Sequence, residues 1–172
     1  MSVTSKQRGS SCHTLYLSLG IMSVVHVTGP KNYEMSTVHS FMGNLPELLM
    51  AMAKDERTLI CIAEFQNDRY IQFRVSSTRT IVEVVSNQFL SNMNALSTED
   101  EDCLRVLGYE EPSSSRRPNW RYEVQDPMNI VPIVNVANFA ITGALHALSS
   151  DPIKIETFEA PSARPPRQVD AD

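Results

Sequence analysis

The sequence predicts an α+β fold in which an antiparallel β-sheet meander carries its helices on one face. An amphipathic helical pattern comes first, three short β-rich segments follow with two-residue turns between them, and a second long apolar helical pattern comes late in the chain. Short connections place consecutive strands side by side in opposite directions. The expected order is therefore α-β-β-β-α-β-α, with optional strands at both ends.

The first helix is predicted from about residue 38 to residue 54. Its apolar residues recur at three- and four-residue steps, which puts them on one helical face. They are Val38, Phe41, Met42, Leu45, Leu48, Leu49 and Met52. Ser36 or Thr37 can cap its start. Pro46 either kinks this helix, or Asn44 caps a second start with Glu47 completing a capping box.

Three strands are predicted next, over residues 58–65, 69–75 and 79–85. The first is a nearly continuous apolar run, which suits a central strand, and the third is rich in β-branched residues. The second alternates cleanly, so that one face carries Ile71, Phe73 and Val75 and the other carries Tyr70, Gln72 and Arg74.

A short helix and a fourth strand come after this meander. Thr98 and Glu101 are expected to form the capping box of the helix, with the acidic run 99–102 in its first turn and Gly108 at its end. Residues 119–125 then alternate again. This fourth strand is expected to carry Trp120, Tyr122 and Val124 on one face.

The last helix is expected to begin at Asp126-Pro127 and to stop at Asp151-Pro152. One face carries Ile130, Ile133, Val134, Ala137, Ile141, Leu145 and Leu148, and that face is widened by Val131, Val136, Phe139 and Ala144. One side of such a helix can cover the sheet while the other meets a partner or a second copy of the chain. The alternating segment 153–158 could add an edge strand.

These elements place the core domain at residues 36–159, between two ends of different character. The tail 160–172 holds three prolines and almost no large apolar group, which predicts disorder. Residues 1–35 form an uncertain extension whose apolar stretch 15–27 follows a basic start. It is interpreted as an extra strand or hairpin at the domain edge, as a leader with the true start at Met22 or Met35, or as a weak signal peptide.

Composition excludes several classes of protein. The chain has 172 residues, 15 basic and 20 acidic side chains and a net charge of −5, which disfavours general nucleic-acid binding. No stretch approaches the ~20 apolar residues that span a bilayer. The three cysteines, Cys12, Cys61 and Cys103, lack metal-ligand spacing and cannot all pair within one chain, so we expect a reducing, cytoplasmic location.

No motif of catalysis, metal binding or cofactor binding stands out. The four histidines lack metal-ligand spacing, Cys61 lies in an apolar strand, and there is no Gly-rich phosphate loop. We therefore expect no catalytic residue, no metal and no cofactor. An enzyme remains an alternative, with a polar pocket built from Glu64, Arg74, Glu83 and Arg121 on the strands. A regulatory adaptor is another, with the loop from Ser113 to Arg117 as a phosphorylation site or anion contact.

Several short segments, in order, resemble a known family. They are RYIQF at 69–73, EVVSN at 83–87, LGY at 107–109 and NW at 119–120, followed by the long helix. Over about residues 38–150 this set resembles the TY-chap domain of actinobacteria, a relative of YbjN-like proteins and type III secretion chaperones. Tyr109 stands where tryptophan is more common in that pattern. The resemblance implies a small α+β fold that binds peptide segments of a partner protein without catalysis and commonly dimerises.

We accordingly predict a non-catalytic, chaperone-like module that binds a protein or peptide and acts as a homodimer. The family's functional residues are poorly defined, so the binding residues are chosen on physical grounds. Large apolar and aromatic groups that could remain exposed make effective anchors. The predicted partner-binding residues are Phe89, Met93, Trp120, Tyr122, Phe139 and Ile141.

Overall fold

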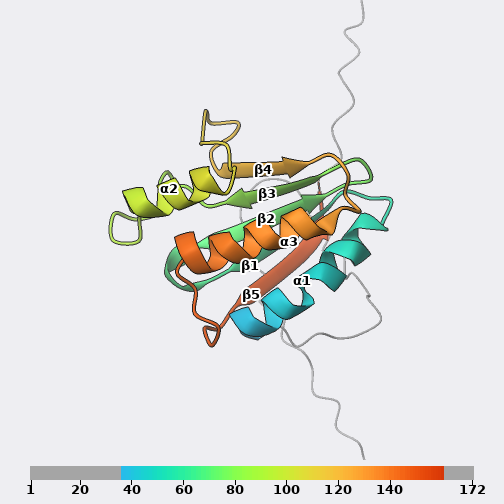
Figure 1. Cartoon of the computed structure of the whole chain (residues 1–172), viewed down its shortest axis with the longest axis horizontal. Coiled ribbons are helices and arrows are strands. Elements are labelled where there is room, and N and C mark those ends of the chain that lie inside the picture. The colour runs from blue at the N-terminus through green and yellow to red at the C-terminus, as the bar shows by residue number, and fades with distance from the viewer. Residues whose placement is uncertain (1–35, 161–172) are drawn as a thin grey trace, which may run out of the picture.

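The computed structural model describes residues 36–160, which form one five-stranded antiparallel sheet with helices on one face (Figure 1). The strands are β1 Leu59–Glu64, β2 Tyr70–Val75, β3 Thr80–Val84, β4 Trp120–Val124 and β5 Lys154–Glu159, in the spatial order β4-β3-β2-β1-β5. The helices are α1 Val38–Ala53, α2 Thr98–Val106 and α3 Ile130–Phe139, and a π-helical turn, η2 Ala140–Ala144, continues α3. A 3₁₀ turn, η1 Gln66–Asp68, joins β1 to β2. The predicted α+β class and meander are confirmed.

The optional last strand is present as β5, an edge strand that pairs with β1. The apolar stretch 15–27 lies outside the described residues, as does the predicted tail beyond Ala160. Between residues 36 and 160, no helix is long and apolar enough to cross a membrane.

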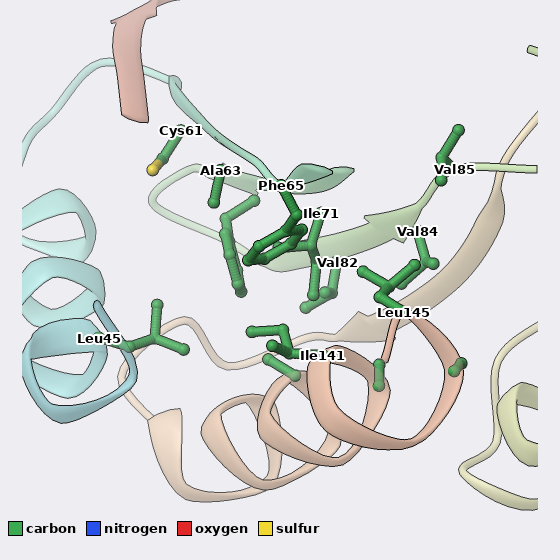
Figure 2. Packing of buried hydrophobic residues seen from close by; sticks show 14 of the residues in the cluster. Leu45, Cys61, Ala63, Phe65, Ile71, Val82, Val84, Val85, Ile141 and Leu145 are labelled. Carbon is green, nitrogen blue, oxygen red and sulfur yellow. The ribbon is translucent and has the colours of Figure 1, made fainter. Parts of the chain in front are cut away.

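The register of the sheet divides its side chains between a covered face and an open face. Ile71 of β2 is paired with Ala63 of β1 and Val84 of β3, and all three are buried on the face beneath α1 and α3. Figure 2 shows Leu45 of α1 and Ile141 of η2 projecting toward this side of the sheet. The alternate residues, such as Gln72 and Arg74, point to the open face.

The first helix is continuous through Pro46, so the predicted second start at Asn44 is not formed. Thr37 caps the helix in a capping box with Ser40. The side-chain amide of Asn44 donates a hydrogen bond to the carbonyl oxygen of Ser40, one turn earlier, at 2.7 Å. The side chain is thus bonded within the helix and does not cap a new one. The buried apolar face, which runs on both sides of Pro46, holds the helix together despite the missing N–H group.

The predicted capping box of α2 was wrong by one residue. Ser97, not Thr98, is the cap, and Asp100 completes the box: the Asp100 N–H donates to Ser97 Oγ at 3.2 Å and the Ser97 N–H donates to Asp100 Oδ2 at 2.9 Å. Asp100, with its shorter side chain, accepts the backbone hydrogen bond that was expected of Glu101. Gly108 ends the helix as predicted, with a φ of 87° in the left-handed region.

The predicted limits of the last helix were also wrong. Asp126 does not cap a helix but closes a turn, in which Oδ1 accepts the N–H of Met128 at 3.0 Å, and α3 begins at Ile130. At its other end the helix widens into η2 and stops well before Asp151. His146 takes a left-handed backbone conformation, φ 52°, which cannot continue a right-handed helix.

Candidate binding surface

The six predicted partner-binding residues occupy three different environments. Phe89, Met93 and Phe139 are exposed and Tyr122 is half-buried, whereas Trp120 and Ile141 are buried. The exposure on which the prediction rested therefore does not hold for Trp120 and Ile141. Trp120 lies on the covered face of β4 with the Arg105 guanidinium 5.3 Å from its ring centre, and Ile141 points into the core (Figure 2).

Phe89 and Met93 belong to the loop between β3 and α2, apart from the other residues of the set. Side-chain hydrogen bonds from Arg69 and Asn87 hold that loop against the domain. Arg69 donates to the carbonyl oxygens of Asn94 and Leu145, at 3.3 and 3.1 Å, and the side chain of Asn87 bonds both the N–H and the carbonyl group of Leu96. Met93, at 96% exposure, lies on the outside of this anchored loop.

Two further exposed apolar side chains, Val106 and Phe139, lie where α2 meets the end of α3. The two helices approach closely, because a Cβ atom at Gly143 would lie 3.0 Å from Cys103 Sγ. They run in opposite directions in Figure 1, so Val106, one turn after Cys103, and Phe139, one turn before Gly143, lie toward the same end of the contact. Val106 is 88% exposed and Phe139 is 62% exposed.

Tyr122 of β4 lies under this end of the contact. Its Cε2 atom is 3.6 Å from the Cβ position of Gly108, which follows α2 by two residues. We call Val106, Tyr122 and Phe139 the α2–α3 surface. In the sequence, the apolar face of the last helix is wide enough to include Phe139, and this width indicated part of the α2–α3 surface. Val106 was missed, because a single apolar residue on the outer side of a short helix carries no periodic signal.

An aromatic layer supports the α2–α3 surface from below. The rings of Tyr109 and Tyr122 are tilted against each other with centres 5.7 Å apart. Tyr109 is buried, and this burial raises the pKa of its phenol. Among the described residues, neither the Tyr109 hydroxyl nor Trp120 Nε1 has a hydrogen-bond partner. The layer is thus held by packing, which fixes the ring of Tyr122 in place.

The open face of the sheet has a different, polar character. Gln72 donates to Glu83 at 2.8 Å, and Arg79 and Arg121 both bind Glu123. The hydrogen bond from Arg121, followed by that from Arg79, lowers the pKa of Glu123. The Gln72–Glu83 bond joins β2 to β3, and the Arg79–Glu123 pair joins the residue before β3 to β4, whereas Arg121 and Glu123 belong to the same strand.

The four residues of the alternative enzyme pocket share this open face but do not converge. Glu83 and Arg121 are neighbours in register on β3 and β4, and Glu64 lies 3.6 Å from Lys154 Nζ at the opposite side of the sheet. Of the four, Arg74 borders the hollow between the β2–β3 turn and the ends of β4 and β5, which the other three residues do not line. The four side chains therefore do not share that hollow.

The remaining candidate groups are the Cys61 thiol, possible metal ligands and the loop from Ser113 to Arg117. Burial raises the pKa of the Cys61 thiol to about 12, which keeps it protonated. Within residues 36–160, no three His, Cys, Asp or Glu side chains are placed to hold a metal ion. The loop from Ser113 to Arg117 is an exposed turn closed by a hydrogen bond from the Ser113 N–H to the Arg117 carbonyl oxygen, and its modification stays a prediction.

Comparison with known proteins gives one match. Residues 39–147 match the model of the family described as T3SS (YopN, CesT) and YbjN peptide-binding chaperone 3, TY-Chap3. No curated protein and no solved structure matches the chain. The matched range runs from α1 to just beyond η2, so it contains the whole α2–α3 surface and leaves out β5.

Proposed function

We infer that this chain, which belongs to the TY-Chap3 family of peptide-binding chaperones, binds an unfolded segment of a partner protein on the α2–α3 surface, without catalysis. The observation that carries the proposal is the exposure of Phe139 and Val106 at one end of the contact between α2 and η2, where the half-buried ring of Tyr122 lies close to Gly108. Large apolar side chains that stay in water on a rigid base are typical of binding anchors.

The chemistry of the surface favours apolar side chains of an unfolded chain. Removing one such side chain from water on each partner contributes about 1.5–3 kcal/mol before the cost of ordering is subtracted. Because Tyr122 is held by Tyr109, little further ordering of the surface is needed on binding. A folded partner would hide the apolar residues that this surface needs, so an unfolded segment is the better ligand.

The other predicted residues take supporting roles in this proposal. Trp120 and Ile141 hold β4 and η2 in place from the core. Phe89 and Met93 would contact a longer segment that extends toward the loop between β3 and α2. We further propose a reducing, cytoplasmic location, since Cys61 and Cys103 are both free thiols.

The test uses a reduced, carboxymethylated model protein that is permanently unfolded and carries a fluorescent label. Anisotropy should show that the wild-type chain binds it and that Phe139→Ala and Val106→Ala each weaken binding at least about fivefold. Leu148→Ala is the matched control, because it removes an exposed apolar side chain outside the surface. Equal binding by all four proteins, or no binding by the wild type, would contradict the proposal.

We also propose that two copies associate through the start of α3. Val131 and Met128 are exposed there, apart from the α2–α3 surface. A Val131→Lys variant should shift the light-scattering mass from dimer to monomer at micromolar concentration, while Phe139→Ala should leave the mass unchanged. A wild-type chain that is monomeric at every concentration would exclude this association and leave the peptide-binding proposal standing.

A further inference from the structure

A hollow opens at one end of the open face, on the opposite side of the sheet from the α2–α3 surface. Its volume is about 660 Å³. The turn between β2 and β3 forms one wall, and the ends of β4 and β5 form the others. The residues that matter for its chemistry are Thr58, Arg74, Ser77, Ile81, Gln125 and Glu159.

Arg74 is the cation available in this hollow. Among the described residues it has no ion pair and no side-chain hydrogen bond, whereas the second arginine of the lining, Arg79, is bound to Glu123 at 3.1 Å. A guanidinium group presents its N–H donors in a planar fork that matches the two oxygens of a carboxylate. The hydroxyls of Thr58 and Ser77 are further donors without partners among the described residues.

Arg74 lies over an apolar part of the open face, of which Ile81 lines the hollow. Strand register places Arg74 directly between Ile60 of β1 and Ile81 of β3, and both isoleucines are only 4% exposed although they lie on the open face. Arg74 is the side chain between them, so its aliphatic stem is placed to cover them while its charged end stays in water. A ligand on Arg74 would therefore meet this aliphatic stem beside the charge, with Ile81 beneath it.

The balance of charge selects a single negative group. Glu159 also lines the hollow, but the pairing of β5 with β1 sets it opposite Leu59, on the covered-face side of the register, and its carboxylate lies 3.6 Å from Arg57. With one unpaired guanidinium among the described lining residues, the charge of a monoanion is matched, whereas a phosphate dianion would keep one charge unmatched. The aliphatic stem of Arg74 and its unpaired guanidinium group together favour a carboxylate attached to an apolar residue.

We propose that this hollow binds a carboxylate carried by an apolar stretch of a polypeptide, with Arg74 as the residue that recognises it. The site is separate from the α2–α3 surface and goes beyond the function proposed above. The carboxylate is supplied by the C-terminus of a polypeptide or by an Asp or Glu side chain between apolar residues. Both sources present the same chemistry to Arg74.

The experiment is an NMR titration of the ¹⁵N-labelled full chain with three short probes. They are acetyl-Val-Leu with a free carboxyl group, acetyl-Val-Leu amide, and acetyl-Val-Glu-Val amide. The free acid, the glutamate peptide or both should shift the amide signals of Ser77, Ile81 and Gln125. The neutral amide should not. Which charged probe binds then identifies the source of the carboxylate.

Substitutions test the role of Arg74. Arg74→Gln should weaken binding of the charged probe at least about tenfold, and Arg74→Lys should recover only part of the loss because the planar fork is absent. Arg116→Gln removes the same charge from an exposed loop outside the hollow and should bind as the wild type does. Circular dichroism melting checks that each variant is folded.

Three results would overturn this inference: no shift with either charged probe, equal binding by Arg74→Gln and the wild type, or tighter binding of inorganic phosphate than of the peptides. The proposed chaperone function is judged separately, because it depends on Val106 and Phe139 and on a different ligand. If carboxylate binding at Arg74 is disproved, binding of an unfolded chain on the α2–α3 surface can still be measured, and the reverse also holds.

Discussion

The Nε2 atom of His146 lies 2.6 Å from Oδ1 of Asp100, and this contact joins the segment after η2 to the start of α2. Asp100 is only 4% exposed, and its other oxygen accepts the N–H of Ser97 in the capping box. One buried carboxylate thus serves a local cap and a tertiary contact 46 residues away. The position of α2, and with it Val106, depends on both.

Asp100→Ala is expected to lower the free energy of unfolding by about 2 kcal/mol. The variant keeps Ser97 as the cap but loses the hydrogen bond from the Ser97 N–H to Asp100 and the hydrogen bond to His146, each of which contributes about 1 kcal/mol. Urea denaturation followed by circular dichroism measures the change. Glu99→Ala, in the same turn but exposed, is the control and should stay within about 0.5 kcal/mol of the wild type. Equal losses in the two variants would contradict the dual role of Asp100.

At His146, glycine is expected to be better tolerated than alanine. Both substitutions remove the bond to Asp100, but alanine must also adopt the left-handed backbone conformation, φ 52°. We expect His146→Gly to exceed His146→Ala in free energy of unfolding by about 1 kcal/mol. The reverse preference is expected at Ala51 inside α1, where Ala→Gly should cost about 1 kcal/mol. The same sign at both positions would show that backbone conformation at His146 does not matter.

Two buried or half-buried tyrosines should respond oppositely to loss of the hydroxyl group. The Tyr109 hydroxyl has no hydrogen-bond partner among the described residues, so Tyr109→Phe should leave stability unchanged or raise it by up to about 1 kcal/mol. The Tyr70 hydroxyl accepts the side-chain N–H of Asn119 at 3.0 Å, so Tyr70→Phe should lower stability by about 1 kcal/mol. Thermal melts of the two variants against the wild type measure the difference. A clear loss in Tyr109→Phe would mean that its hydroxyl is in fact partnered.

Cys61 is expected to resist alkylation for as long as the chain is folded. With its pKa at about 12, only about one thiol in ten thousand is ionised at pH 8. Iodoacetamide labelling followed by peptide mass mapping should modify the half-buried Cys103 first and Cys61 only in urea. Rapid labelling of Cys61 in the native protein would contradict its burial.

The raised pKa of Cys61 also makes stability depend on pH. Between pH 9, near the ordinary pKa of a thiol, and pH 12, the unfolded chain loses a proton that the folded chain keeps. The contribution of Cys61 to the free energy of unfolding therefore falls as the pH rises.

Local periodicity was sufficient for the order of the elements and for the faces of most of them. The alternation of Ile71, Phe73 and Val75 predicted which side of β2 is buried, and the three- and four-residue steps predicted the buried face of α1. These patterns work because each strand and helix has a fixed repeat and needs one apolar side. The edge strand β5 was also predicted from the alternation of residues 153–158.

The candidate binding surface could be predicted only in part. Tyr122 and Phe139 were among the chosen residues, but Trp120 and Ile141 were chosen on the same physical grounds and lie in the core. Apolar character alone does not tell an anchor from a core residue. Trp120 and Tyr122 share the covered face of β4, but Trp120 lies beneath Arg105 of α2, and Ile141 points toward the sheet (Figure 2). These burials come from the packing of the helices and not from the side chains themselves.

By itself, the sequence determined an α+β meander, its buried faces and the lack of a recognisable catalytic motif, because these depend on residues close together in the chain. The tertiary structure decided the rest. Ser97 became the cap of α2 in a box completed by Asp100, which also meets His146. Val106 came to lie toward the same end of the contact between α2 and η2 as Phe139. Arg74 came to lie unpaired between Ile60 and Ile81 through the pairing of three strands. Each of these depends on contacts between distant segments, for which a local pattern carries no signal.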